Sequence, residues 1–307
     1  MTALASALGC LADQMLGEPP LRWHPVARYG SIMHRIEAKL YADQRVNGVA
    51  FSAIGVGLGV SVGVLLRRTL GSTLAVAVAT GVSAAGKMLD DEANTLASML
   101  DAGDLHAARQ RVRSLVGRNT DDLDAQEISR AVIESVAENS VDAVTSSLFW
   151  ASVGGAPAVL AHRAINTLDA MVGHHDERYE RFGWASARLD DVANYIPARL
   201  TAFSVALARP TRIKAISTTI RRDAPQHPSP NGGVIEAAFA AALGVQLGGV
   251  NRYDNEIEDR GTLGHGPAPT VASIEAAVDL RRHATIVTAV LLIASSALFQ
   301  VVARRNR

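Results

Sequence analysis

Two long runs of uncharged, mostly apolar residues dominate the hydrophobic pattern of the chain. They cover residues 48–66 and 284–303. A run of roughly 20 such residues is long enough to cross ~30 Å of hydrocarbon as an α-helix. We therefore predict that both runs are transmembrane helices. For the first run, together with the apolar residues 71–86 that follow it, the alternative is a buried helical hairpin of a soluble protein.

A shorter apolar segment follows the first run. It covers residues 71–86 and comes directly after Arg67 and Arg68. Its Gly, Ala and Ser residues allow two helices to pack closely in a membrane. The two segments therefore predict a membrane hairpin with a tight turn at the arginine pair.

The region after this hairpin is more polar and has the spacing of amphipathic helices. Leu89, Leu96 and Leu100 recur at helical intervals, and the apolar spacing resumes at Leu105 after a break at residues 101–104. We interpret these paired helices as scaffold.

The fold class follows from these patterns. Asp124, with Glu127 three positions later, forms a capping box that predicts the start of another helix. We find no internal repeat, no low-complexity tract and no strand alternation of useful length. We predict an all-α, polytopic membrane fold with amphipathic helices, in one domain over residues 1–307 with a more polar helical insertion at about 87–140.

The composition supports a membrane protein and excludes other classes. Hydrophobic residues make up 48% of the 307 residues, more than an ordinary soluble domain has. The 30 Lys and Arg balance the 30 Asp and Glu, so there is no overall attraction to nucleic acid. Cys10 alone excludes a disulfide framework or thiolate metal cluster. Asp13 within the first apolar stretch and the lack of a basic start argue against a cleavable signal.

An acidic stripe precedes the next apolar segment. Glu134, Glu138 and Asp142 are spaced i, i+4 and i+8, so they lie on one helical face and repel one another. Carboxylates at a membrane edge are functional candidates, and Mg²⁺ shared with substrate phosphates would relieve the repulsion. The alternative is a solvated stripe paired with Arg130.

A second polar group follows the apolar residues 141–161. Arg163, Asn166 and Asp169 are spaced i, i+3 and i+6, so they share a broad helical face and can converge on one ligand. Further along the chain, the guanidinium groups of Arg178, Arg181 and Arg188 are suited to binding phosphate or carboxylate. Asp190 and Asp191 provide the oxygen ligands that hard metal ions prefer.

Two other polar motifs have competing interpretations. His174, His175 and Asp176 could suggest zinc, but without a third ligand at a metalloenzyme spacing we favour a solvated turn. In "HPSPNGG", Ser229 or Asn231 can cap the following helix, whose free amides could bind phosphate. A plain capped turn explains that motif equally well.

The polar motifs together carry a family resemblance. The segments "LGEPPLRWHP", "ESVAENSVDAV", "HRAINTLDAMVG", "DERYERFGWASARLDDVANYIPARLTA" and "HPSPNGGVIEAAFAAALGVQLGG" span almost the whole chain. In this order they resemble the CobD/CbiB family, the adenosylcobinamide-phosphate synthases of cobalamin biosynthesis. Two departures are Glu18, where the family usually has Asp, and His174–His175, where Tyr and a polar residue are more common.

The resemblance implies an activity. It implies an integral membrane enzyme that uses ATP and Mg²⁺ to join adenosylcobyric acid, a cobalt corrinoid, to (R)-1-amino-2-propanol phosphate or an ethanolamine counterpart. In the implied mechanism, ATP phosphorylates a carboxylate and the primary amine then attacks it. Protein side chains would mostly position groups, bind Mg²⁺ and neutralise phosphate charge.

The predicted site residues fall into three groups. We expect a direct part in catalysis for Glu138, Asp142, Arg163 and Asp169. We expect contacts to substrate or phosphate from Asn139, Asn166, Arg178, Trp184, Arg188, His227, Ser229, Asn231 and His24. The expected metal ligands are Glu138, Asp142, Asp190 and Asp191.

Topology follows from the positive residues and from the cytoplasmic location of ATP. Lys and Arg are frequent in residues 22–45 and 87–130, which predicts that these segments are cytoplasmic. If residues 163–191 also face the cytoplasm, residues 141–161 cannot make a simple crossing, and the Gly-Gly-Ala-Pro at 154–157 would break them into a re-entrant or buried pair. We expect a multi-pass protein of the cell membrane. The expected partners are its substrates, the bilayer and other cobalamin-pathway enzymes. A transporter or a non-catalytic scaffold is the alternative function.

Overall fold

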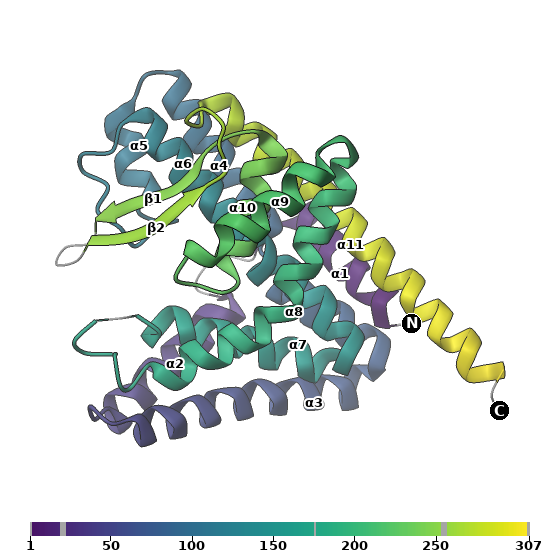
Figure 1. Ribbon diagram of the computed structural model, residues 1–307. Helices are drawn as coiled ribbons and strands as arrows, with labels where there is room; N and C mark the ends of the chain where they lie inside the picture. Colours follow the sequence, from purple (N-terminus) through teal and green to yellow (C-terminus); the bar gives the residue numbers. More distant parts are fainter. Residues whose placement is uncertain (1, 19–22, 175, 253–256, 306–307) are drawn as a thin grey trace. The chain divides into compact units, whose positions relative to one another are not determined.

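The computed structural model describes residues 2–18, 23–174, 176–252 and 257–305 (Figure 1). The chain is mostly helical, as predicted, and divides into two compact units. Unit 1 comprises Met1–Lys87, Asp142–Pro197 and Ala289–Arg307, and unit 2 comprises Met88–Val141 and Ala198–Thr288.

Unit 1 is built from long apolar helices. These are α1 (Thr2–Leu16), α2 (Pro25–Leu40), α3 (Arg45–Ser83), α7 (Ser146–Val172), the first part of α8 (Trp184–Ala208) and the end of α11 (Val271–Arg305), with the π-helix η2 (Ser140–Thr145) leading into α7. Small residues let α3 pack directly on α7. A Cβ atom at Gly63 would lie 2.4 Å from Pro157 Cα, and one at Gly59 would lie 2.6 Å from Leu160 O. Because glycine has no side chain, these positions allow the backbones of α3 and α7 to pack in direct contact.

The hairpin predicted in α3 turns at a different residue. The helix continues through Arg67 and Arg68 and breaks at Gly71, whose φ of 75° and ψ of 165° are non-helical. The expected turn at the arginine pair was therefore wrong, because only glycine adopts this backbone conformation easily whereas arginine is a good helix former. Val62 and Val78, on opposite sides of the break, line the same cavity of about 510 Å³, so the chain does fold back here.

The predicted break in the following apolar segment is confirmed. Within α7, Gly155 has a φ of 67° and a ψ of −154°, and Pro157 lies inside the helix. The proline has no N–H to donate and its ring excludes a straight helix. This break divides α7 before the polar residues that begin at His162.

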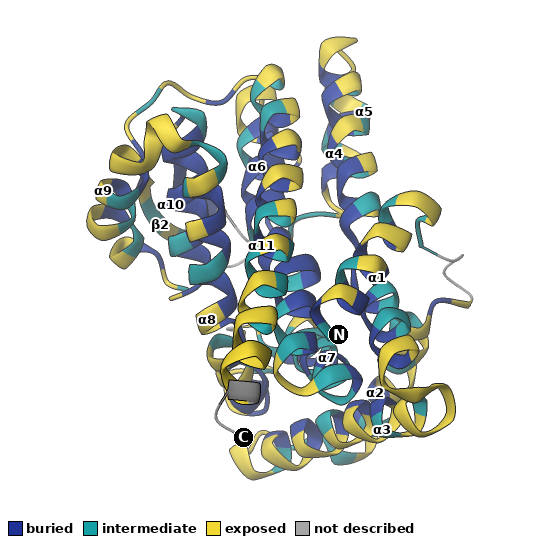
Figure 2. Ribbon diagram, turned by 90° about the vertical axis from the view of Figure 1, so that its right-hand side faces the viewer, coloured by how far each residue is buried: buried dark blue, intermediate teal, exposed yellow. Residues whose placement is uncertain are grey.

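Among the described residues, three helical segments are long and apolar enough to cross a membrane. They cover Arg45–Asp101, Ala125–Val172 and Val271–Ala303. In the last of these, only 6% of the apolar window is buried, and Figure 2 shows mostly exposed and half-buried residues toward the C-terminal end of α11. Exposed apolar surface on this scale calls for lipid. The chain is therefore a helical membrane protein.

Unit 2 has its own hydrophobic core. Its helices are α4 (Gly86–Asp101), α5 (Leu105–Val112), α6 (Ala125–Asn139), the end of α8, α9 (Ile213–Asp223), α10 (Gly232–Leu243) and the start of α11, with 3₁₀ turns η3 (Pro210–Arg212) and η4 (Ala224–Gln226). Leu89, Leu96 and Leu100 are buried as their spacing predicted. The residues of the predicted polar insertion at about 87–140 belong to this unit, together with Ala198–Thr288.

The capping box at the start of α6 is confirmed. The Asp124 carboxylate accepts from the Glu127 amide at 2.8 Å, and the Glu127 carboxylate accepts from the Asp124 amide at 2.9 Å. The box satisfies two backbone donors that the helix leaves unpaired. It fixes where α6 begins, and hence the register of the acidic residues along it.

A β-hairpin was not predicted. Strands β1 (Leu247–Arg252) and β2 (Ile257–Leu263) pair antiparallel, and the buried Leu247 lies opposite the buried Leu263. The register shifts between Gly248 and Val250, and Gly248 has a positive φ of 75°. This bulge interrupts the apolar–polar alternation by which a strand is recognised in a sequence.

Candidate functional site

A cluster of polar side chains lies in unit 1 between α7 and the first part of α8. We call it the α7–α8 polar cluster, and it consists of Asp142, Ser146, His162, Arg163, Asn166, Asp169, Asp190 and Asn194. Five of its members were predicted as site residues from the sequence, namely Asp142, Arg163, Asn166, Asp169 and Asp190. Asn194 and His162 lie in motifs quoted above, but their roles were not foreseen.

Asn194 is the centre of this cluster. Its side-chain N–H group donates to Asp142 Oδ1 at 3.1 Å and to Asp190 Oδ2 at 3.0 Å. Its carbonyl oxygen accepts from Ser146 Oγ at 2.7 Å and from His162 Nε2 at 2.8 Å. These partners assign the amide orientation and the His162 tautomer. One buried amide therefore holds two carboxylates side by side.

The two carboxylates carry charge that the amide does not cancel. Burial and the neighbouring Asp169 raise the pKa of Asp190 to about 7. Mg²⁺ binds proteins through one or two carboxylates and keeps its other positions for water and phosphate. Asp142 and Asp190 therefore fit this ion by their donor atoms. Asp191, the other metal ligand predicted on α8, instead lies 3.6 Å from Arg188.

Arg163 connects this cluster to the N-terminal motif. Its Nη1 donates to Asn166 Oδ1 at 3.2 Å, while its buried Nε has no hydrogen-bond partner in the described part of the chain. The carboxylates that act on it electrostatically belong to Glu18 and Asp142. Glu18 Oε2 lies 3.3 Å from His24 Nε2, and burial raises the pKa of Glu18. The guanidinium thus has a donor available for an anionic ligand.

Three predicted phosphate-binding residues have other contacts. Arg178 donates to Glu37 Oε1 at 3.2 Å, and its guanidinium lies 4.3 Å from the Tyr41 ring centre. Trp184 lies under the Arg45 guanidinium at 5.1 Å. These contacts, like that of Arg188, explain the side chains without a ligand. In the group considered for zinc, His175 lies outside the described residues.

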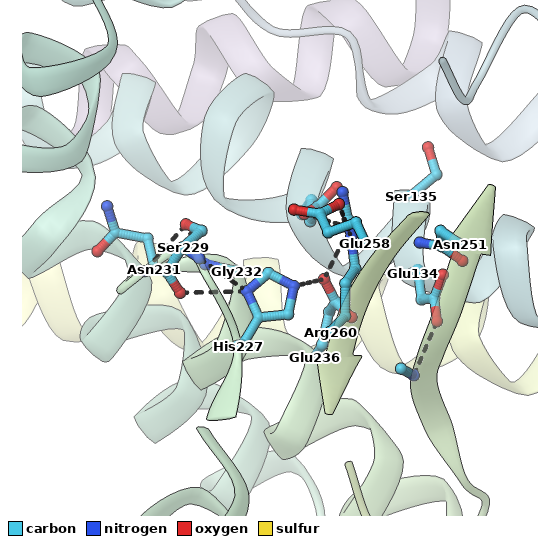
Figure 3. Close-up of polar contacts among 12 residues, drawn as sticks. Glu134, Ser135, His227, Ser229, Asn231, Gly232, Glu236, Asn251, Glu258 and Arg260 are labelled. Atoms are coloured by element: carbon cyan, nitrogen blue, oxygen red, sulfur yellow. Dashed lines mark hydrogen bonds and ion pairs between the residues drawn. The ribbon is translucent and has the colours of Figure 1, made fainter. Parts of the chain in front are cut away.

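A second polar cluster lies within unit 2 (Figure 3). Glu138 from α6, His227 from the turn after η4 and Glu236 from α10 have ligand atoms within 4.8 Å of one another. His227 Nε2 is 3.3 Å from Glu236 Oε1. Arg260 on β2 lies 3.6 Å from Glu138 and 3.8 Å from Glu236, and its Nε donates to Glu258 at 3.1 Å. We call the first three residues the Glu138–His227–Glu236 cluster.

The electrostatics of this cluster favour a neutral histidine. Burial and the Arg260 charge lower the pKa of His227. Burial, together with the neighbouring Glu134, raises the pKa of Glu236 to about 8. Carboxylates this close cannot all be ionised unless a cation or a proton compensates them.

Two glycines explain why the chain can form this cluster. A Cβ atom at Gly232 would lie 2.9 Å from His227 Cε1 and 3.1 Å from Glu138 Oε1. A Cβ atom at Gly233 would lie 2.6 Å from both Ala224 O and His227 Cβ. The Gly-Gly pair thus lets the histidine turn pack against the first turn of α10.

The first turn of α10 is capped by the chain itself. Ser229 Oγ accepts from the amides of Gly232 at 3.0 Å and Asn231 at 3.3 Å. Asn231 Oδ1 accepts from Arg199 at 3.1 Å, and Asn139 on α6 donates to the Ser135 carbonyl at 2.9 Å. Ser229 thus satisfies the first amides of the helix, whereas the N-cap residue Asn231 makes no side-chain cap. A phosphate contact of Ser229 or Asn231 stays a prediction.

Glu236 was missed although the sequence contained a signal. It is the single charged residue of α10, whose residues Gly232–Leu243 are otherwise apolar, and it is fully buried. A lone buried carboxylate is costly unless paired or ligating a cation. The stripe prediction assigned Glu138 and Asp142 to one metal site, and that joint role stays a prediction. The contacts within each unit put Asp142 with Asp190, and Glu138 with Glu236.

Comparisons with known proteins agree with the family resemblance. The family model described as CobD/Cbib protein matches residues 6–281. The chain belongs to the CobD/CbiB family. A cobalamin biosynthesis protein CobD of Mycobacterium tuberculosis H37Rv is 43% identical over 297 residues, covering 95% of each chain. Proteins of the same name from Chromobacterium violaceum (40% identical, 97% of each chain) and Pelobacter propionicus (38%, 96% and 95%) also match. No solved structure matches the chain.

Proposed function

We propose that this CobD/CbiB-family protein acts in cobalamin biosynthesis as an ATP-dependent amide-forming ligase. Its substrates would be adenosylcobyric acid and (R)-1-amino-2-propanol phosphate, or an ethanolamine analogue, and its product adenosylcobinamide phosphate. The observation that carries the proposal is the family match over residues 6–281. The names of the relatives, which are cobalamin biosynthesis proteins, support the pathway.

The proposed reaction has two steps, phosphorylation of the carboxylate and then amide formation. The substrate carboxylate attacks the γ-phosphorus of ATP, which gives an acyl phosphate and ADP. The primary amine then attacks the acyl carbon, and inorganic phosphate leaves as the amide forms. Neither step requires a protein nucleophile, so the protein would act by positioning and by electrostatic stabilisation.

The α7–α8 polar cluster has the residues that this chemistry requires. Asp142 and Asp190 would hold Mg²⁺, which neutralises phosphate charge when bound. Asn194 would keep both carboxylates oriented, since it donates to each of them. Arg163, whose Nε has no hydrogen-bond partner among the described residues, would bind a phosphate or carboxylate oxygen. Asp169 would modulate Asp190 by its charge.

The location and partners are part of the proposal. A multi-pass position in the cell membrane agrees with the three apolar segments, and a cytoplasmic active site follows from the need for ATP. Other enzymes of the pathway would pass the corrinoid to and from this protein.

A test must separate the ligase from a transporter or a scaffold. Purified protein is incubated with ATP, Mg²⁺ and both substrates, and the amide product and ADP are measured. The ligase produces both in equal amounts. Substrate binding without product supports a scaffold, and movement of an unchanged corrinoid across a vesicle membrane supports a transporter.

A further inference from the structure

When its carboxylates are ionised, the Glu138–His227–Glu236 cluster has more negative charge than its neighbours balance. The carboxylates of Glu138, Glu236 and Glu258 share the single guanidinium of Arg260 within 4 Å, at 3.6, 3.8 and 3.1 Å. In the described ranges this leaves two negative charges if all the carboxylates are ionised. One divalent cation would balance them.

The neighbouring charges reduce this excess without cancelling it. Glu134 lies next to the cluster and acts on Glu236 electrostatically, but it already forms an ion pair with Arg118 at 3.1 Å. It also accepts from the Gly248 amide at 2.9 Å. That pair is neutral overall. Arg130, whose charge acts on Arg118, offsets one of the two negative charges, so one remains with the cluster.

The buried atoms of the cluster lack hydrogen-bond partners. Both carboxylate oxygens of Glu236 and Nε2 of His227 have no hydrogen-bond partner among the residues that the structure describes. The side chains of Glu236 and His227 are 0% and 1% exposed. Desolvated polar atoms of this kind cost stability unless a ligand satisfies them. Figure 3 shows the His227 ring pointing toward Glu236, and ligand atoms of both residues lie within 4.8 Å of one of Glu138.

The second nitrogen of His227 can fix the tautomer that a metal ion needs. Nδ1 lies 3.2 Å from the Ser229 carbonyl oxygen. If Nδ1 carries the proton and donates to this carbonyl, the Nε2 lone pair points toward Glu236 and Glu138, which is the usual arrangement behind a metal-binding histidine. The Ser229 amide, 3.1 Å from Nδ1, can stabilise the other tautomer when no ion is bound.

Space for the remaining ligands lies beside Glu138. A cavity of about 110 Å³ is lined by Glu138, Arg260, Ser135 and seven other residues. A water molecule occupies about 30 Å³, so the cavity can hold waters next to the Glu138 carboxylate. Gly232 lies close to the same carboxylate, since a Cβ atom there would be 3.1 Å from Glu138 Oε1.

We propose that Glu138, His227 and Glu236 bind one divalent transition-metal ion, such as Mn²⁺. One imidazole nitrogen with two carboxylates is a donor set for Mn²⁺, Fe²⁺, Co²⁺ or Zn²⁺, whereas Mg²⁺ prefers oxygen ligands alone. The proposed site uses none of the residues proposed as Mg²⁺ ligands in the α7–α8 polar cluster. The inference does not rest on the ligase reaction, because it concerns metal binding without ATP or substrate.

The test measures Mn²⁺ binding to the full chain in detergent after removal of metal by a chelator. We expect a bound Mn²⁺ whose pulsed electron paramagnetic resonance spectrum shows coupling to an imidazole nitrogen. His227→Gln removes this coupling. His162→Gln, which changes the buried histidine of the other cluster, retains it.

If His227→Gln does not fold, a second variant that preserves the side-chain shape, Glu236→Gln, tests metal binding. Glu236→Gln keeps the volume of the side chain, and its affinity for Mn²⁺ should fall at least about tenfold. Glu275→Gln, an exposed glutamate of the same unit, leaves the affinity unchanged. Absence of imidazole coupling in the wild-type protein, or the same Mn²⁺ affinity in Glu236→Gln, would overturn the proposal.

Discussion

The two polar clusters both contain closely spaced carboxylates, but different groups hold those carboxylates in place. In the α7–α8 polar cluster, the neutral amide of Asn194 donates to Asp142 and Asp190. In the Glu138–His227–Glu236 cluster, a histidine and a guanidinium lie against the carboxylates. An amide fixes geometry without cancelling charge, whereas an imidazole can become a ligand itself.

This difference separates two kinds of chemistry. Oxygen donors with their charge retained suit Mg²⁺ and a phosphate that shares it. A buried nitrogen donor between carboxylates suits a transition metal. The type of neighbour, more than the number of acidic residues, therefore decides what each cluster can bind.

The largest expected effect is on the α7–α8 polar cluster. Asn194→Asp removes both donated hydrogen bonds and adds a carboxylate between Asp142 and Asp190, which now repel it. We expect amide formation to slow about 100-fold or more. The turnover rate at saturating ATP and Mg²⁺ is the measurement. Asn119→Asp, at an exposed position in unit 2, is the control and keeps the wild-type rate. Normal turnover in Asn194→Asp contradicts the role of the amide.

Arg163 provides the next largest effect. A lysine retains the charge but cannot form two parallel hydrogen bonds, so Arg163→Lys should lose nearly as much activity as Arg163→Ala, roughly 10- to 100-fold. The kinetic constants for both variants are compared with those of Arg35→Lys, an exposed position on α2. If Arg163→Lys is fully active, Arg163 contributes only its positive charge, and the predicted pair of parallel hydrogen bonds is wrong.

A smaller effect is expected on the second cluster alone. Gly232→Ala places a methyl group within 2.9 Å of His227 and 3.1 Å of Glu138. Mn²⁺ affinity should fall about tenfold as the ligands shift, while the Mg²⁺ dependence of turnover changes little. Gly30→Ala, where a Cβ atom has nothing within 4 Å, is the matched control. Equal loss of Mn²⁺ and Mg²⁺ responses would mean that the two clusters are not independent.

The smallest effect is expected from cysteine labelling, which tests topology. Cysteines at position 176 in unit 1 and position 221 in unit 2, in a Cys10→Ser background, should both be labelled from the cytoplasmic side and leave activity intact. Labelling of position 176 from outside would be incompatible with the proposed re-entrant arrangement.

The helices were predictable because their signals are local. The break at Gly155 in α7 and the capping box at Asp124 follow from residues adjacent in sequence. The turn at Gly71 was misplaced because arginines suggested a polar loop, while the backbone conformation required glycine. The β-hairpin was missed because its bulge at Gly248 hides the alternation.

The sites were only partly predictable because their contacts join distant segments. The spacing of Arg163, Asn166 and Asp169 identified one face of α7, but nothing local linked it to Asn194 on α8. His227 and Glu138 were selected for separate reasons. Their meeting with Glu236 depends on how α10 packs against α6, which no motif of a single sequence reveals.

The most direct test of the ligase is the Mg²⁺ dependence of amide formation by purified protein and by its Asp142→Asn variant. The account predicts that the wild-type protein forms one amide for each ADP released. The variant should require more Mg²⁺ and turn over about 100-fold more slowly. An absence of amide product from the wild-type protein, or an unchanged Mg²⁺ dependence in Asp142→Asn, would contradict it.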